Sequence, residues 1–239
     1  MDDVELLIFD LDGTLVDTAP EIADTVNDVL AEAGLAARDP AHIRTWIGHG
    51  ARATLKRALL AQPGDFADRT DIDALLDPLM RRFDFFHGQR CGTTGEPFPG
   101  VRATLDALCA RGQRMALLTN KEARFTAQVL RRHDLQGFFD PVISGDSLDD
   151  RKPSAKPVRH CLAWHGTTAG RTVLVGDSGV DAQTARNSGI RFWAVPYGYN
   201  GSTPIEATRP DRLLSHFGEL LERTAAPARA LAGRAATTR

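Results

Sequence analysis

Five short apolar runs in this chain each end abruptly at polar residues or a proline, and this pattern limits the folds that it can adopt. Each run holds three or four mostly apolar residues without polar alternation, which is typical of strands buried on both faces of a parallel sheet. The runs are Leu6–Phe9, Met115–Leu118, Pro141–Ile143, Thr172–Val175 and Phe192–Val195. We therefore predict an α/β fold with a parallel sheet at its centre.

The segments between these runs support that fold class. Apolar residues at helical spacing, such as Val101, Leu105 and Leu108, separate the later runs. Strands that alternate with helices favour right-handed crossovers and a doubly wound, Rossmann-like sheet. Residues 17–90 break this rhythm, because they carry several helical patterns and no convincing strand. We interpret them as an α-helical cap domain inserted after the first strand.

The domain boundaries follow from these patterns. We expect residues 1–16 and 96–222 to form the α/β core. Residues 17–95 would form the cap and its return hinge, because the segment that leads back to the core is rich in Gly and Pro. Residues 223–239 are rich in Ala, Arg and Thr, and we expect a disordered tail there.

The composition is typical of a globular protein without a strongly charged partner. Of the 239 residues, 42% are hydrophobic, and the formal net charge of −2 gives no support for nucleic acid or a membrane surface as the main partner. The three cysteines lack metal-ligand spacing, which favours reduced thiols, and the N-terminus has no signal-peptide pattern. We expect a cytoplasmic monomer or homodimer.

Polar residues follow three of the predicted strands directly. Asp10, Thr119 and Asp177 each stand at such a strand end or one residue beyond it. Because ligands of open parallel sheets bind beyond the carboxyl ends of the strands, we expect the three to meet in one crevice. Asp10 and Asp12 would lie on the same side of an extended chain, and Gly13 allows a sharp turn after them. Alone, this pair could also be a loop cap or another kind of metal site.

Four motifs resemble those of the haloacid dehalogenase superfamily and occur in the same order. They are residues 9–15 (FDLDGTL), Thr119-Asn120, Lys152-Pro153 and residues 176–181 (GDSGVD). The resemblance covers about residues 4–220. The helical insertion, residues 46–50 and residues 197–201 are similar to the phosphoglycolate phosphatase branch of this superfamily.

The charges in these motifs require a cation. Asp10, Asp12, Asp177 and Asp181 would bring up to four negative charges together, with Lys152 as the clear positive charge among the motifs. Mg²⁺ fits such a site, because it binds few carboxylates and bridges to phosphate oxygens. The resemblance implies that Asp10 and Asp177 are side-chain ligands, that Asp12 contributes its backbone carbonyl, and that Asp181 lies in or near the outer ligand shell.

The resemblance also implies catalytic roles. Asp10 would be the nucleophile that takes the phosphoryl group, and Asp12 the general acid and then the general base. Lys152 would hold Asp10 and the phosphate together, with Lys156 as the rival candidate.

Substrate contacts are expected from the core and from the cap. Thr119 would offer its hydroxyl and its backbone N–H to the phosphate, with Asn120 as neighbour, although a Thr at a strand end is often a helix cap. In the cap, Gly48 and Gly50 precede a helical pattern whose free N–H groups could receive a substrate carboxylate. His49 could be a substrate contact or an exposed loop residue. Arg52 could assist, or lie on a solvated helix face.

The resemblance implies a Mg²⁺-dependent phosphatase for a small phosphate monoester, with 2-phosphoglycolate as the leading substrate. Alternatives are a phosphatase for a phosphosugar or nucleotide, a phosphosugar mutase of the same superfamily, and a catalytically silent binding module.

Overall fold

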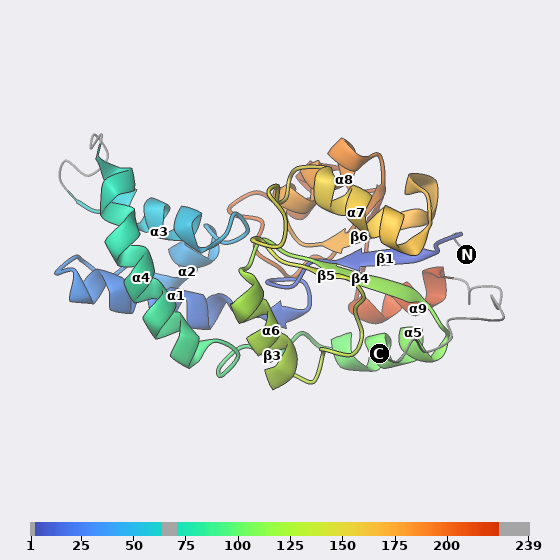
Figure 1. Cartoon of the computed structure of the whole chain (residues 1–239), viewed down its shortest axis with the longest axis horizontal. Coiled ribbons are helices and arrows are strands. Elements are labelled where there is room, and N and C mark those ends of the chain that lie inside the picture. The colour runs from blue at the N-terminus through green and yellow to red at the C-terminus, as the bar shows by residue number, and fades with distance from the viewer. Residues whose placement is uncertain (1–2, 64–70, 225–239) are drawn as a thin grey trace, which may run out of the picture.

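A six-stranded parallel sheet forms the centre of the protein, seen in a computed structural model that describes residues 3–63 and 71–224 (Figure 1). The strand order is β5-β4-β1-β6-β7-β8, and every neighbouring pair is parallel. The strands are β1 (Leu6–Phe9), β4 (Arg114–Leu118), β5 (Val142–Ile143), β6 (Thr172–Gly176), β7 (Arg191–Ala194) and β8 (Arg212–Leu213). The predicted doubly wound α/β fold is confirmed, and the five apolar runs correspond to five of these strands.

Helices cover both faces of the sheet, which explains why its strands are apolar throughout. Successive residues of β1 point to opposite faces: Leu6 and Ile8 pack with α7 and α8, whereas Leu7 and Phe9 pack with α5, α6 and α9. These core helices are α5 (Val101–Ala110), α6 (Ala123–Arg132), α7 (Lys156–His165), α8 (Gly179–Ser188) and α9 (Leu220–Arg223). Three short 3₁₀ turns accompany them: η2 (Ala169–Arg171), η3 (Ile205–Thr208) and η4 (Phe217–Glu219).

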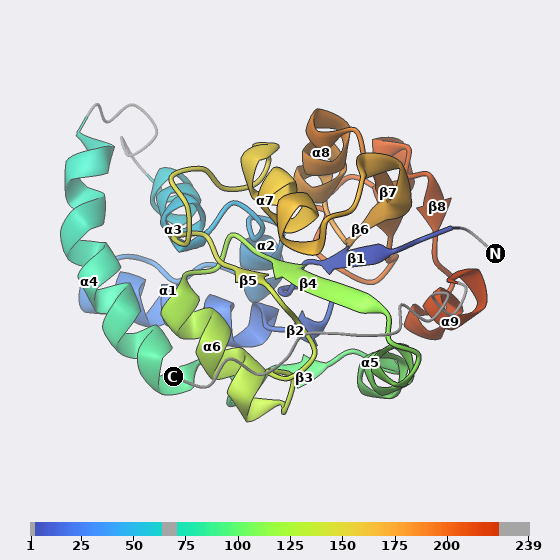
Figure 2. The ribbon, with the colours of Figure 1, turned by 45° about the vertical axis from the view of Figure 1, so that its right-hand side comes forward.

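Four further helices gather beyond the carboxyl ends of the strands (Figures 1 and 2). They are α1 (Ala19–Glu32), α2 (Pro40–Arg44), α3 (Ala51–Leu60) and α4 (Ile72–Arg90). Their apolar faces belong to the same hydrophobic cluster as Phe9, through buried side chains such as Ile22, Val26 and Phe83. The helical insertion therefore lies over the end of the sheet where parallel α/β proteins bind ligands.

The two segments that connect the sheet to these four helices pair with each other. β2 (Val16–Asp17) and β3 (Glu96–Pro97) form a two-stranded antiparallel ladder. The predicted boundaries after residues 16 and 95 fall at this ladder. Neither strand was expected from the sequence, because two-residue strands are too short to produce a periodic pattern.

The C-terminal boundary is shifted relative to the expectation. Arg223 belongs to α9, and Thr224 is buried and donates its hydroxyl to the Leu220 carbonyl. Of the predicted tail, residues 225–239 lie outside the described residues. None of the helices in the described ranges combines the length and the apolar character needed to cross a bilayer.

Candidate active site

The polar residues after β1, β4 and β6 lie at one edge of the sheet, in the register that the pairing sets. Phe9 pairs with both Leu117 and Val175, so the three strands end in nearly the same register and the residues that follow them lie side by side. Asp10, Thr119 and Asp177 are each at least 95% buried. The structure therefore brings together the side chains that the sequence predicted to converge.

Lys152 contacts two of the carboxylates directly. Its ammonium lies 2.8 Å from Asp10 Oδ1 and 2.7 Å from Asp181 Oδ1, and its side chain is 1% exposed. Burial opposes the charge of Lys152, but the two carboxylates outweigh it and hold the Lys152 pKa above its usual value. Lys156, the rival candidate, is half exposed and lies 3.6 Å from Asp149 and Asp150. Lys152 is thus the lysine positioned against the predicted nucleophile.

Asp177 is held by two donors from different segments. The Thr14 hydroxyl donates to Oδ1 at 3.0 Å, and the Tyr199 N–H donates to Oδ2 at 2.6 Å. Burial, and then the charge of Asp181, raise the pKa of Asp177 to about 7. A Cβ at Gly198 would overlap the Asp177 side chain, so glycine is needed for this close approach.

Asp181 is oriented by the start of α8. Ser178 is the N-cap of this helix, and its hydroxyl donates to Asp181 Oδ2 at 2.6 Å. The other oxygen, Oδ1, is the one that contacts Lys152. Both oxygens of Asp181 therefore have protein partners, which suits a residue that positions Lys152 and supports a metal site from its outer shell.

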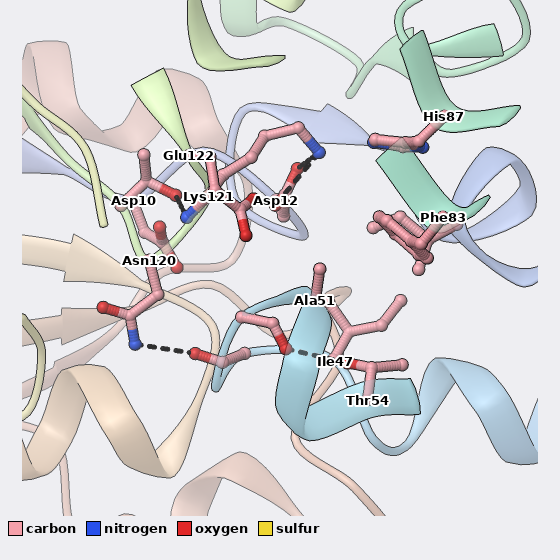
Figure 3. A pocket seen from close by; sticks show the side chains of 14 residues that line it. Asp10, Asp12, Ile47, Ala51, Thr54, Phe83, His87, Asn120, Lys121 and Glu122 are labelled. Carbon is pink, nitrogen blue, oxygen red and sulfur yellow. Dashed lines mark hydrogen bonds and ion pairs between the residues drawn. The ribbon is translucent and has the colours of Figure 1, made fainter. Parts of the chain in front are cut away.

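Asp12 has its own cation, Lys121, which the sequence motifs did not identify. The Lys121 ammonium lies 3.1 Å from Asp12 Oδ1, and the Thr18 hydroxyl donates to the same oxygen at 2.7 Å (Figure 3). The Lys121 side chain is 4% exposed. Despite its burial, the pKa of Lys121 is raised by the carboxylate of Asp12. Its position directly after Thr119-Asn120, in the same strand-end loop, was the available signal.

The charge balance of the site fits a divalent cation. Carboxylate oxygens of Asp10, Asp177 and Asp181 lie within 4.8 Å of one another, and all three residues are buried. Because Lys121 pairs with Asp12, Lys152 offsets one of these three acids, which when all are ionised keep a net charge of −2. Burial and the neighbouring acids raise the pKa of Asp10 accordingly. An all-oxygen donor set with this charge matches Mg²⁺.

Two predicted phosphate contacts need correction. The Thr119 N–H is not available to a phosphate, because it donates to the Ile143 carbonyl at 3.0 Å in the β4–β5 ladder. The Thr119 hydroxyl accepts from the Lys121 N–H at 3.2 Å, which leaves its own proton for a ligand. The side-chain NH₂ of Asn120 donates to the carbonyls of Gly48 and Lys152. Asn120 therefore joins the cap to the core, and its NH₂ group is not free for substrate.

A small cavity opens beside Asp10 and Asp12. Its volume is about 40 Å³, enough for only a few atoms. The polar side is formed by the strand-end loops of the core, and the opposite wall by apolar cap residues around α1, α3 and α4 (Figure 3). These wall residues are Ile22, Ile47, Ala51 and Phe83, with His87 beside them.

A model of haloacid dehalogenase-like hydrolases matches residues 7–195 of this chain. The chain belongs to this family. The match spans five of the six strands of the sheet, from β1 to β7, and includes the four inserted helices, so the family covers most of the core and the cap.

Proteins that resemble this chain in sequence or in structure support its assignment to this family. A protein named phosphoglycolate phosphatase from Nitrosospira multiformis is 40% identical over 197 residues, covering 82% of this chain and 85% of its own. One of the same name from Aliivibrio fischeri is 34% identical over 221 residues, covering 92% and 96%. A crystal structure described as a predicted phosphoglycolate phosphatase from Haemophilus somnus has a TM-score of 0.86 at 30% identity and covers 93% of this chain and 98% of its own.

In this haloacid dehalogenase-like hydrolase, only some of the cap residues predicted to contact substrate line the cavity. Gly48 and Gly50 line it, with φ angles of +121° and +90° that favour glycine. Of the two alternatives for His49, the structure shows the exposed loop residue, because His49 does not line this cavity and instead lines a separate one of about 330 Å³ that also includes Arg57. Of the two roles considered for Arg52, the structure favours the exposed helix face over a substrate contact. Arg52 lies on the solvent side of α3, where it pairs with Asp77 at 2.6 Å.

Proposed function

We propose that this hydrolase is a Mg²⁺-dependent phosphatase that converts 2-phosphoglycolate to glycolate and phosphate through a phosphorylated Asp10. The observation that carries the proposal is the placement of Asp10 at the edge of a small capped cavity, in contact with Lys152 and beside two further acids. The substrate is supported by relatives of that name, which match nearly the whole chain. We also propose that the protein acts in the cytoplasm on a free small molecule.

The first step is the attack of an Asp10 oxygen on phosphorus. Lys152 holds the Asp10 carboxylate in place and offsets the charge that the phosphate brings. The Thr119 hydroxyl has a free proton for a phosphate oxygen. When bound, Mg²⁺ would supply the positive charge that offsets the remaining acids and the phosphate. Asp10 and Asp177 would hold it with their side chains and Asp12 with its backbone carbonyl, with Asp181 behind them.

Asp12 would handle the protons of both half-reactions. It lines the cavity on the side of Asp10, where Thr18 and Lys121 contact its Oδ1 and Lys121 also lies 3.4 Å from Oδ2. In the first half-reaction a protonated Asp12 would give its proton to the departing alkoxide and become the carboxylate that Lys121 and Thr18 hold. In the second it removes a proton from the water that attacks the phosphorylated Asp10. Such general acid–base assistance contributes about 10²–10⁴ in rate.

The structure of the cap favours a substrate whose leaving group is small and anionic. α3 begins at Gly50 without a side-chain cap, and Ala51 in its first turn lines the cavity. The unpaired N–H groups of a helix start favour an anion, so we propose that they receive the substrate carboxylate. The cap closes over this side of Asp10, which favours a small substrate over the phosphosugar and nucleotide alternatives.

The substrate proposal is tested by ranking phosphate monoesters by kcat/KM. We expect 2-phosphoglycolate to exceed glucose 6-phosphate and a nucleoside monophosphate by at least about 10-fold, because the larger groups would have to displace more of the cap residues that close the site. A higher value for either competitor would contradict the substrate assignment. Phosphoryl transfer to a sugar phosphate in the presence of a bisphosphate would instead favour the mutase.

The Asp177→Asn variant tests the metal assignment. We expect the Mg²⁺ concentration for half-maximal activity to rise by roughly 10–100-fold, because one charged ligand is lost. Activity is measured in a Mg²⁺ titration with p-nitrophenyl phosphate. Asp149→Asn is the matched control, since the Asp149 side chain is 98% exposed, and it should leave the titration unchanged. An unchanged Mg²⁺ requirement in Asp177→Asn would remove Asp177 from the ligand set.

A further inference from the structure

A second cluster of metal-binding side chains lies in the cap, apart from the acids at the strand ends. Glu21 of α1, His87 of α4 and Cys91, which directly follows α4, each offer one ligand atom, and these atoms lie within 4.8 Å of one another. The three residues are 0%, 2% and 0% exposed. A carboxylate, an imidazole and a thiol so close together and so deeply buried are unlike the all-oxygen set around Asp10.

Glu21 has a poorly partnered oxygen. Its Oε2 accepts the Gly92 N–H at 2.8 Å, whereas Oε1 is buried without a well-formed hydrogen bond, with only the Gly95 N–H and the Cys91 thiol near the carboxylate. Leaving a buried carboxylate oxygen poorly paired costs free energy, because the oxygen has lost its water and gained little in exchange. A bound cation would supply a stronger partner.

His87 is neutral and rigidly held. The Thr25 hydroxyl donates to the Glu21 carbonyl at 2.7 Å, so at 3.2 Å from His87 Nδ1 it acts as the acceptor of an Nδ1–H. This tautomer leaves the lone pair on Nε2. Phe125 packs edge-on against the ring, with 4.6 Å between ring centroids, and burial lowers the pKa of His87 to about 2. The imidazole is thus in the unprotonated form that binds metals.

Cys91 can complete a site that is electrically neutral. Its thiol makes a weak contact with the Phe125 carbonyl at 3.7 Å, and burial raises its pKa to about 12, so the protein alone holds a thiol there. A divalent ion would displace the thiol proton to solvent and bind the thiolate. The thiolate and the Glu21 carboxylate then carry −2, which balances the ion. Lys121 is a nearby cation, and it is already paired with Asp12.

We propose that Glu21, His87 and Cys91 form a second metal site, with the preference for Zn²⁺ that a sulfur, a nitrogen and an oxygen ligand confer. Binding follows Zn²⁺ + Cys91–SH → Cys91–S–Zn⁺ + H⁺, with Glu21 and His87 as the other protein ligands and a fourth position open. Mg²⁺ would not compete here, because it prefers oxygen ligands. The case for this site does not rest on the proposed phosphatase activity.

The position of the site gives the ion a structural effect. Cys91 and Gly92 start the segment that returns from the cap to the core, and His87 lies in the wall of the active-site cavity (Figure 3). A bound ion would therefore fasten α1, α4 and the start of the return segment to one another. We expect Zn²⁺ to stabilise the fold and to slow turnovers that require the cap to move.

The first test uses Co²⁺ as a spectroscopic substitute for Zn²⁺, added to the full chain in the presence of saturating Mg²⁺. We expect a thiolate-to-Co²⁺ charge-transfer band that saturates at one equivalent and is lost when Zn²⁺ is added. Cys91→Ser should abolish the band. Cys161→Ser should retain it, because Cys161 is equally buried but packs in the apolar cluster under α7 and α8. Asp177→Asn should retain it too, since the acids at the strand ends provide no sulfur.

A second readout covers the case in which Cys91→Ser fails to fold. In Glu21→Gln we expect the affinity for Zn²⁺, measured by competition with a chromophoric chelator, to fall roughly 10–100-fold. The Tm of the wild-type protein should rise with Zn²⁺ concentration, and that of Glu21→Gln should rise less. Absence of a Co²⁺ band in the wild type, a band that persists in a folded Cys91→Ser, or equal Zn²⁺ affinity in Glu21→Gln would overturn the proposal.

Discussion

Asp10→Asn is expected to lower kcat for 2-phosphoglycolate by about 10⁴-fold or more, because the amide cannot serve as the nucleophile on which the other groups depend. The substitution keeps the size of the side chain, so Lys152 and the surrounding sheet should keep their positions. The measurement is steady-state hydrolysis with saturating Mg²⁺. It is combined with mass spectrometry of acid-quenched wild-type enzyme, in which the phosphoryl group should be found on the peptide that contains Asp10.

Asp12→Asn is the matched control for this experiment, since it changes the neighbouring carboxylate in the same way. It should cost about 10²–10⁴ in rate and leave Asp10 able to accept the phosphoryl group. If the phosphoryl group were found on a residue other than Asp10, or if Asp10→Asn retained wild-type turnover, the covalent mechanism would be wrong.

Lys152→Met is expected to lower the free energy of unfolding by about 3–5 kcal/mol, in addition to its effect on catalysis. Lys152 contacts Asp10 and Asp181 at 2.8 Å and 2.7 Å, and all three side chains are buried. Removing the ammonium leaves two carboxylates in a poorly solvated site without their shared partner. The measurement is chemical denaturation in the absence of Mg²⁺, so that a bound ion does not mask the loss.

Lys156→Met provides the comparison, because Lys156 is half exposed and its two acidic neighbours are 3.6 Å away. Its effect should stay within about 0.5 kcal/mol, as for most exposed pairs. Equal stability of Lys152→Met and the wild type would mean that the Lys152 contacts contribute nothing net to folding. A loss of stability without a loss of activity would remove Lys152 from the catalytic machinery.

The parts of the fold that sequence patterns predicted are those where burial is repeated over several residues. β1, β4 and β6 are unbroken apolar runs because helices cover both faces, and the polar residue after each run marks the ligand-binding edge. β8 was not predicted, since a two-residue edge strand with an exposed Leu213 leaves no such pattern.

Contacts between segments that are far apart in the sequence could not be predicted from local sequence patterns. Asn120 looked like a phosphate contact beside Thr119, but its NH₂ group is taken by Gly48 and Lys152, which are 72 and 32 residues away. The Thr119 N–H donates to the Ile143 carbonyl of β5 and is likewise not free for phosphate. Lys121 lies in the same loop, yet only its 3.1 Å contact with Asp12, across 109 residues, identifies it as part of the site.

The sequence by itself determined the α/β class, the inserted helices and the strand-end positions of Asp10 and Asp177, because these depend on hydrophobic periodicity along the chain. The tertiary structure alone decided which polar groups are free and which are already paired. It paired Lys121 with Asp12, placed Arg52 against Asp77, and left Glu21 with a poorly partnered oxygen near His87 and Cys91. The physical reason is that hydrogen bonds and ion pairs act over a few ångströms in space, and folding brings residues within that range regardless of their separation in sequence.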